Sequence, residues 1–322
     1  MKKMSPDEVL ELADAFNVLG PSESRTLQEV GSRLKLNNRQ ARRFLSALGA
    51  DCPARLRVAL NYSKLPVVTT AILLKAANPA AIPEMTNAFA KSEFMDTVFE
   101  LCGNATHLLL LRLPASDFAE RINYPNVIER LPGKIRSSST VFAYRQYFED
   151  GIRGAPEGAK AALDERDWLT LRALYNDANR TLDELAAEVG VKKPSLHRRL
   201  KQLRESGVVR GYDCELQYGN LPPARHPLSF VFAMKVAAEE EAALADSLIK
   251  NYPRNIGFLY RTHGEFDVLM SVRFRELSEY RQFLSSGLGA FKSVRLRSFL
   301  VVQEKRGDWL YDNAMRVHTE HR

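Results

Sequence analysis

The sequence predicts an α+β protein in which two winged helix-turn-helix domains alternate with two βαββαβ domains. Three observations support this fold class. The stretch Thr181–Gly207 has the capping and turn residues of two short helices joined by a tight turn. A diverged copy of this stretch lies at Thr26–Leu48, and each copy is followed by the same succession of β-rich and helical runs. A chain of 322 residues is also too long for one ordinary core.

The second copy has every local signal of a helix-turn-helix. Thr181 and Glu184 form a T-x-x-E capping box, so a helix is expected to begin there. Gly190 tolerates a positive φ where that helix should end. Pro194 suits the first turn of the next helix, because its missing N–H would be unbonded there anyway. The apolar residues of this second helix recur at helical spacing and predict a buried stripe of Leu196, Leu200 and Leu203.

The opposite face of this second helix is basic and is predicted to contact double-stranded DNA. Arg198, Ser195 and Gln202 are expected to reach base edges, because these side chains can hydrogen-bond in the major groove. The lysines are expected to meet phosphates. The complete predicted set is Lys192, Lys193, Ser195, His197, Arg198, Lys201 and Gln202. The alternative is a solvated charged face, which is the usual role of a run of charges.

The first copy keeps the pattern but not every residue. A shift of 155 residues places Thr26 on Thr181 and predicts a buried stripe of Ala41, Leu45 and Leu48. Lys35 stands where the second copy has Gly190. Asn37 and Asn38 are good helix-capping residues. DNA contact by the first copy is predicted for Arg39, Arg42 and Arg43, with a solvated face again as the alternative.

Each copy has a further amphipathic helix before it and a short strand after it. The expected helices are Val9–Leu19 and one that begins near Asp164. The expected strands, or wings, begin at Arg55 and at Gly207. Three helices are the minimum that buries a helix-turn-helix, so both copies are complete modules.

The segments that follow predict two βαββαβ domains, the ferredoxin-like arrangement of a sheet with two helices on one face. The elements expected in the first are Pro66–Ala76, Ala81–Ala90, Val98–Gly103, His107–Leu113, Ala115–Ile122 and Ser138–Tyr147. Those expected in the second are Pro227–Ala237, Glu239–Asn251, Ile256–Gly264, Asp267–Phe274, Glu276–Ser286 and Val294–Glu304. The predicted domains are 1–62, 63–150, 162–222 and 223–310, with a linker at 151–161 and a polar tail at 311–322.

Composition limits the function. The formal charge of +7 favours a polyanionic partner. The three cysteines form neither a metal motif nor a disulfide framework, which favours a reducing cytoplasm over an oxidising compartment. They are small structural residues or, alternatively, include a nucleophile. No run approaches a membrane span, and no catalytic, zinc or phosphate-binding pattern occurs. We therefore predict a cytoplasmic non-enzyme that uses no metal and no cofactor.

Several motifs of the second half occur in the order found in the Lrp/AsnC (feast/famine) transcription regulators. They are LDERDWLTLRAL, TLDELAAEVGV, LHRRLKQLRESGVVRGY and THGEFDVLMSV. The chain resembles this family from about Leu163 to Trp309, whereas its first half resembles it in pattern only. The resemblance implies a sequence-specific DNA-binding regulator whose sensor domains dimerise through their sheets, assemble further and bind an amino acid or similar effector. Two sensor domains in one chain are expected to form an internal pseudo-dimer, and the chain a homo-oligomer.

The same resemblance implies that Gly264, Glu265, Phe266 and Asp267 bind the effector. The alternative is a plain hairpin turn, with glycine at the required backbone angle and Asp267 closing the turn by a hydrogen bond. The first half has Gly103-Asn104-Ala105-Thr106 there and is not expected to bind the same ligand.

Two other functions remain open. Siroheme decarboxylases have the same two-domain layout, and Tyr260, Arg261 and His263 lie in the region where such enzymes use His and Arg. A sensor-only interaction protein is the other alternative. The basic face within Ser195–Lys201 favours the regulator over both.

Overall fold

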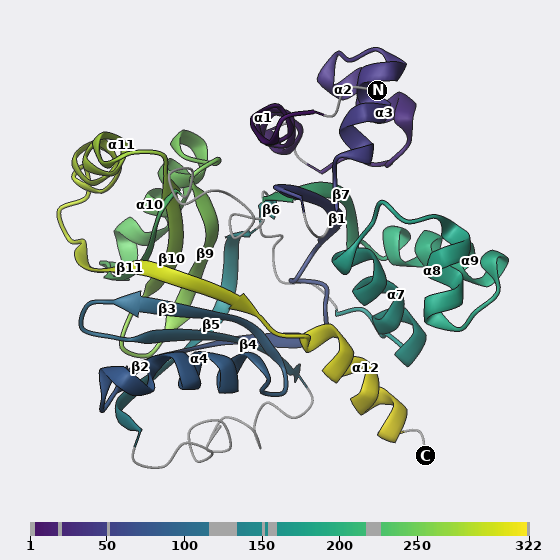
Figure 1. The fold of residues 1–322 in the computed structure, drawn as a ribbon. Helices are drawn as coiled ribbons and strands as arrows, with labels where there is room; N and C mark the ends of the chain where they lie inside the picture. Colours follow the sequence, from purple (N-terminus) through teal and green to yellow (C-terminus); the bar gives the residue numbers. More distant parts are fainter. Residues whose placement is uncertain are drawn as a thin grey trace. The chain divides into compact units, whose positions relative to one another are not determined.

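The computed structural model describes residues 4–18, 21–49, 52–115, 134–149, 152–153, 160–216 and 227–320. These residues form two compact units, and each unit takes elements from both halves of the chain (Figure 1). The helix-turn-helix unit comprises the described parts of Met1–Leu65, Asp150–Ile152 and Gly158–Pro227. The sheet unit comprises those of Pro66–Glu149, Arg153–Glu157 and Leu228–Arg322. Within these described ranges, none of the helices is long and apolar enough to cross a membrane.

The helix-turn-helix unit contains the two predicted three-helix modules. The elements of the first module are α1 (Pro6–Val18), α2 (Leu27–Leu34), α3 (Asn38–Ser46) and β1 (Ala54–Leu60). Those of the second are α7 (Glu165–Asn176), α8 (Leu182–Val189), α9 (Lys193–Glu205) and β7 (Val209–Leu216). The Thr181–Glu184 capping box is present, and Gly190 ends α8 with φ 70°. The predicted helix boundaries of the second module are therefore confirmed.

The first module reaches the same shape with different residues. Lys35 ends α2 in the left-handed conformation, with φ 54°. Glycine usually occupies such a position, because a side chain makes this conformation less stable. Asn37 caps α3 in a capping box with Gln40. The predicted apolar stripe was wrong at Leu45, which is only partly buried, whereas Phe44 is fully buried. The i, i+3, i+7 spacing of Ala41, Phe44 and Leu48 also lies on one helix face, and burying the larger aromatic side chain removes more apolar surface from water.

The sheet unit contains the strands predicted for the two βαββαβ domains. In the first half they are β2 (Val67–Ala76), β3 (Met95–Cys102), β4 (His107–Pro114) and β5 (Ile135–Glu149), with α4 (Ile82–Ala90) after β2 and the short β6 (Ile152–Arg153) after β5. In the second half they are β8 (Leu228–Lys235), β9 (Ile256–His263), β10 (Val268–Phe274) and β11 (Arg295–Arg306), with helices α10 (Ala238–Asn251) and α11 (Leu277–Gln282). A π-helical segment, Phe283–Leu288, continues α11. The predicted helix Ala115–Ile122, after its first residue, and most of the predicted linker lie outside the described residues.

The last long strand of each half, β5 or β11, pairs with strands of both halves. β5 pairs with β2 of its own half and then, over its C-terminal part, with β9 of the other half. β11 does the same, first with β8 and then with β3. The strand order is therefore β2-β4-β3-β11-β8-β10-β9-β5-β6, and the additional pairing of β5 with β2 closes the sheet on itself.

Three apolar cores follow from this topology. The inner core is shared by both halves and includes Leu110 and Val141 from the first half, and Phe258 and Phe299 from the second. An outer core lies beneath α4, and another lies beneath α10 and the α11 segment (Figure 1). Successive strand residues face the inner and outer cores alternately, which explains why most of these strands are apolar on both sides.

Most of the predicted polar tail, 311–322, belongs to a helix, α12 (Trp309–Glu320), which begins two residues before it. Trp309 and Leu310 are each only 2% exposed. The Asp312 carboxylate accepts a hydrogen bond of 2.7 Å from the backbone N–H of Phe94. The first turn of α12 thus packs on the first βαββαβ domain, through buried apolar residues that precede the predicted tail and through Asp312 within it.

Candidate DNA interface and sensor turn

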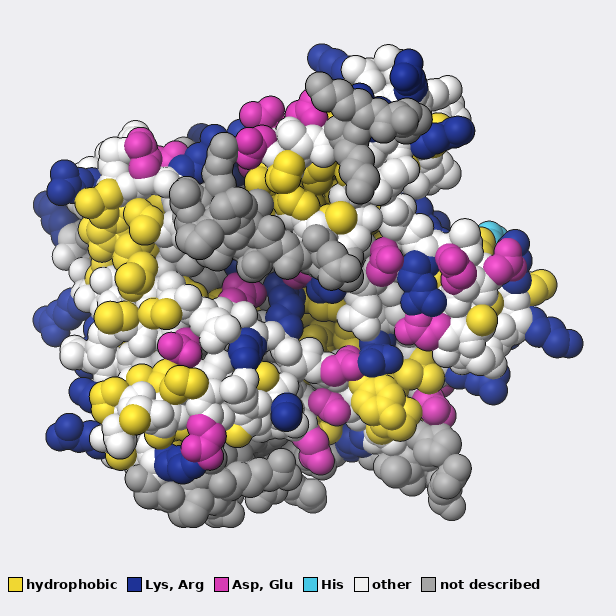
Figure 2. All heavy atoms as spheres, viewed as in Figure 1, with side chains coloured by type: hydrophobic (Ala, Val, Ile, Leu, Met, Phe, Trp, Pro, Cys, Tyr) yellow, Lys and Arg dark blue, Asp and Glu magenta, His cyan; other side chains and the backbone are white. Residues whose placement is uncertain are grey.

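The residues predicted to contact DNA lie along the exposed face of α9. Six of them are exposed, namely Lys192, Lys193, His197, Arg198, Lys201 and Gln202, and Ser195 is partly buried. The opposite face buries the predicted stripe of Leu196, Leu200 and Leu203. Lys and Arg side chains are prominent on the surface over α8 and α9 and over α2 and α3 (Figure 2). Because α9 buries its apolar face in the module, its basic face remains exposed to a ligand.

Ion pairs distinguish the arginine that builds the module from the lysines that face solvent. Arg199 binds Asp164 at 2.7 Å and Asp167 at 2.6 Å, which ties α9 to the start of α7. Partial burial disfavours the charge of Asp164, but hydrogen bonds from the backbone of Asp167 and from Arg199 outweigh it and lower the pKa of the Asp164 carboxyl. Lys193 pairs with Asp183 at 2.8 Å on the surface, where such a pair is weak and easily exchanged for a phosphate.

The basic residues of α3 are arranged less favourably. Arg39 and Arg42 are exposed, but Arg43 is partly buried. In the repeat Arg43 corresponds to Arg198, which is exposed. Two of the three arginines predicted on α3 are thus fully exposed, which is compatible with a second DNA contact.

The strands expected to be separate wings pair with each other. β1 and β7 form a two-stranded antiparallel sheet with Leu56 opposite Cys214. The Asn17 side chain, on α1, donates to the Cys214 carbonyl at 2.6 Å and accepts from its N–H at 2.8 Å. The N–H of Ala178, just after α7, donates to the carbonyl of Leu56 at 2.8 Å. The helices of each module are therefore hydrogen-bonded to the strand of the other module. No local sequence pattern predicts these contacts.

The predicted effector turn, Gly264–Asp267, is held against the end of β8 by hydrogen bonds. Gly264 has φ 134°, and an added Cβ would lie 3.0 Å from the carbonyl oxygen of Thr140. The Asp267 carboxylate accepts from the N–H of Val236 at 3.0 Å and from Lys235 at 3.2 Å. The Asp267 carboxylate thus ties the turn to the end of β8, whereas the backbone bond from the N–H of Thr262 to the carbonyl of Asp267, at 2.7 Å, closes the hairpin.

The other residues of the turn are held by a cation from the last strand. Glu265 pairs with Arg297 at 2.6 Å, and the Arg297 guanidinium lies 5.2 Å from the centre of the Phe266 ring. Phe266 itself is only 4% exposed and belongs to the inner core. Sequence reasoning missed Lys235 and Arg297, because only the pairing of β8 with β10 and β11 brings them to the turn.

The corresponding turn of the first half has no acid. Thr106 takes the place of Asp267, and its hydroxyl accepts from the N–H of Ala76 at 2.8 Å. The next residue, His107, is fully buried, with its ring nitrogens 3.0 Å from the Thr86 hydroxyl and 3.1 Å from that of Thr106. Burial lowers the pKa of His107 and so favours its neutral form. This turn offers no charged group to an amino acid.

The residues considered for decarboxylation do not converge. Tyr260 is 1% exposed in the inner core and accepts a hydrogen bond of 3.1 Å from Arg112. Its neighbour Arg261 points to the other side of the strand and pairs with Glu241 at 2.8 Å. His263 is exposed. In the part of the chain that the structure describes, no cluster of His, Cys, Asp and Glu has the composition of a metal site.

Comparison with known proteins agrees with the helix-turn-helix geometry. A family model described as winged helix-turn-helix DNA-binding matches residues 163–210. The HTH-type transcriptional regulator FL11 of Pyrococcus abyssi is 30% identical over 125 residues, which are 39% of this chain and 80% of that protein. The proline dehydrogenase transcriptional activator of Rhodobacter capsulatus is 27% identical over 146 residues, 44% of this chain and 91% of that protein.

A solved structure shares the fold over nearly the whole chain. The siroheme decarboxylase NirDL, crystallised with an iron-uroporphyrin III analogue, has a TM-score of 0.61 and covers 98% of this chain and 99% of its own, at 10% identity. At that identity the likeness concerns the fold alone. The regulator relatives, in contrast, are similar to this chain in sequence. The chain belongs to the Lrp/AsnC family of helix-turn-helix transcriptional regulators, in a tandem form that carries the family layout twice.

Proposed function

We propose that this regulator binds operator DNA through α9, with α3 as a second and weaker contact. The observation that carries this proposal is the exposed basic face of α9 on a fully capped scaffold within the matched residues 163–210. Arg198, Ser195 and Gln202 would reach base edges, and Lys192, Lys193 and Lys201 would bind phosphates. Arg39, Arg42 and Arg43 would supply the corresponding contacts of α3.

Replacing the central arginine of α9 tests this proposal. Arg198→Ala is expected to weaken operator binding by about 1–3 kcal/mol if the guanidinium contacts a base. The matched control is Arg43→Ala in α3, whose partly buried side chain should matter less. Operators would come from genome-wide mapping of bound sites, and affinities from fluorescence anisotropy. Unchanged affinity of a folded Arg198→Ala protein would refute the assigned role of Arg198.

In the family that the chain resembles, two chains dimerise through the sheets of their sensor domains. We also propose that the two sensor domains of this one chain form the equivalent pair. The exchange of β5 and β11 between the halves supports this internal pseudo-dimer, as does the inner core to which both halves contribute. Any homo-oligomer would then be assembled from such pseudo-dimers.

For the effector we propose an amino acid bound at Gly264–Asp267 together with Lys235 and Arg297. The ligand carboxylate would replace Asp267 and Glu265 as partner of the two cations, and the released Glu265 would accept the ligand ammonium group. The side chains of Lys235 and Arg297 are 48% and 59% exposed, so their present ion pairs are weak and can be exchanged at little cost.

Titration of the protein with a panel of amino acids tests this site. Lys235→Met and Arg297→Met are each expected to weaken binding roughly tenfold, because each removes a charge-assisted hydrogen bond. The control is Lys75→Met, near the end of the corresponding strand β2, whose turn has no acid. Isothermal titration calorimetry provides the readout. Equal losses in all three variants would contradict the assignment to the second sensor domain.

A tetrapyrrole decarboxylase is the second candidate, because the fold of NirDL extends over the whole chain. The separation of Tyr260, Arg261 and His263 weighs against a site built from these residues. Purified protein would be mixed in parallel with siroheme and with its own promoter DNA. Carbon dioxide release would support the enzyme, whereas a DNA mobility shift without turnover would support the regulator.

A further inference from the structure

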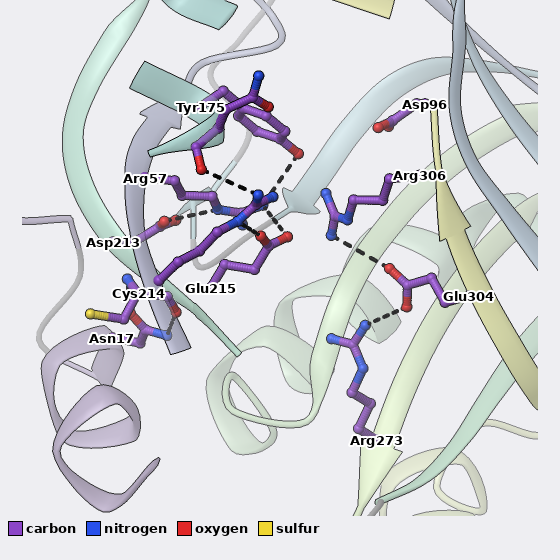
Figure 3. Close-up of polar contacts among 12 residues, drawn as sticks. Asn17, Arg57, Asp96, Tyr175, Asp213, Cys214, Glu215, Arg273, Glu304 and Arg306 are labelled. Carbon is purple, nitrogen blue, oxygen red and sulfur yellow. Dashed lines mark hydrogen bonds and ion pairs between the residues drawn. The ribbon is translucent and has the colours of Figure 1, made fainter. Parts of the chain in front are cut away.

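The two strands that join the helix-turn-helix modules carry opposite charges. β1 contributes Arg55 and Arg57, and β7 contributes Asp213 and Glu215. The register places Arg55 opposite Glu215 and Arg57 opposite Asp213. Arg57 binds Asp213 and Glu215, each at 3.0 Å (Figure 3). Arg55 also binds Glu215. We refer to these four residues as the strand charge cluster.

The strand charge cluster is largely removed from water. Arg57, Asp213 and Glu215 are 4%, 6% and 9% exposed. Arg57 also donates to the Tyr175 hydroxyl at 3.2 Å, and its guanidinium lies 5.2 Å from the centre of that ring. A buried ion pair is costly to break, because the remaining charge is left without a partner in a poorly solvated site. These charges therefore discriminate strongly between matched and mismatched partner strands.

Pairing between identical strands would bring like charges together. If β1 paired antiparallel with a second β1 so that the same faces met, Arg55 of each strand could lie opposite Arg57 of the other. Two copies of β7 would place Asp213 opposite Glu215 in the same way. Like charges directly opposite each other destabilise a strand pair, and burial increases the effect. The repeat has thus diverged in a direction that favours unlike pairing.

We propose that the strand charge cluster makes the first helix-turn-helix module pair with the second module of the same chain, and excludes pairing between like modules of two copies. The chain linking the modules adds to this selectivity, because it keeps the correct partner at high effective concentration. The helix-turn-helix unit is then a closed pair that always contains one α3 and one α9. A further consequence rests on the proposed DNA binding: the two half-sites of an operator are read by different helices and need not be palindromic.

A disulfide across the strand pair reports the pairing directly. Leu56 faces Cys214, whose N–H and carbonyl are both bonded to Asn17 on the side away from β1. The two residues therefore form a non-hydrogen-bonded pair, in which the side chains are close enough for a disulfide. Burial raises the pKa of the Cys214 thiol and makes it slow to oxidise once folded, so Leu56→Cys protein would be expressed in an oxidising host.

The full-length Leu56→Cys chain is expected to form the disulfide within one chain, without covalent dimers, even when two differently tagged copies are expressed together. Adding Arg55→Glu and Arg57→Glu should lower the intrachain cross-link about tenfold or more, because it places four carboxylates together. Adding Asp213→Arg and Glu215→Arg as well should restore it. Arg210→Glu, at an exposed position of β7, is the matched control and should change nothing.

Chains in which the charges of only one strand are reversed also test which strands pair between two copies of the protein. One Leu56→Cys chain would carry the charge-reversed β1 (Arg55→Glu, Arg57→Glu), and a second Leu56→Cys chain would carry the charge-reversed β7 (Asp213→Arg, Glu215→Arg). When the two are expressed together, they should yield interchain disulfides on non-reducing gels. The proposal is overturned if reversal of β1 leaves the intrachain cross-link unchanged, or if the fourfold exchange fails to recover it. The proposal would also be overturned if two differently tagged Leu56→Cys chains, with no charge reversed, formed covalent dimers with each other. Operator binding enters none of these readouts, so failure of the proposed DNA function would be distinguishable.

Discussion

Arg112→Leu is expected to destabilise the protein by about 3–5 kcal/mol, the cost of breaking a buried ion pair from one side. Arg112 has no exposed surface and binds Asp96 at 2.9 Å, and Asp96 itself is only 5% exposed. The substitution leaves the buried Asp96 carboxyl beside an apolar side chain in place of the guanidinium. It also removes the hydrogen bond to Tyr260 in the inner core and the contact with Trp309, whose ring centre lies 6.0 Å from the guanidinium.

The repeat supplies a control for this prediction. Arg273 occupies the corresponding position of the second half and pairs with Glu304 at 3.0 Å, but both side chains are 27% exposed. Arg273→Leu is therefore expected to cost less than about 1 kcal/mol. Urea unfolding would measure both variants. If Arg273→Leu proved as damaging as Arg112→Leu, burial of the Asp96 pair would not be the cause.

Gly211→Ala is expected to destabilise the helix-turn-helix unit by roughly 2–4 kcal/mol, from backbone strain together with a steric clash. Gly211 has φ 144°, which L-residues with a side chain rarely adopt. An added Cβ would lie 2.4 Å from the carbonyl oxygen of Ser22. To relieve this contact the chain must give up the paired backbone hydrogen bonds between Ser22 and Tyr212, at 2.7 and 2.8 Å.

The control is Gly207→Ala, a few residues earlier. Gly207 also has a positive φ, of 74°, but an added Cβ meets nothing within 4 Å. Its cost should be about 1 kcal/mol, that of the left-handed backbone alone. Thermal unfolding compares the two variants, and equal shifts in Tm would show that the contact with Ser22 is unimportant.

The sequence by itself determined the local structure and the positions of the repeats. The capping box at Thr181, the left-handed end of α8 at Gly190 and the buried stripe of α9 all depend on residues within a few positions of one another. The positions of the strands followed from apolar runs, several of them bounded by proline or glycine, although β3 and β5 begin three residues before the predicted starts at Val98 and Ser138. The family motifs of the second half, including the turn at Gly264, were likewise local patterns.

Only the tertiary structure decided which distant elements meet. The pairing of β1 with β7, and the crossing of β5 and β11 into the other half, join segments with no complementary local pattern that would select one partner among several strands. The same long-range pairing brought Lys235 and Arg297 to the sensor turn and packed the predicted tail as α12. It also made Arg112 a buried ion-pair partner and left Arg273 partly exposed, although the repeat makes the two arginines equivalent. The physical reason is that burial and charge pairing depend on what the fold places nearby, which neighbours along the chain do not specify.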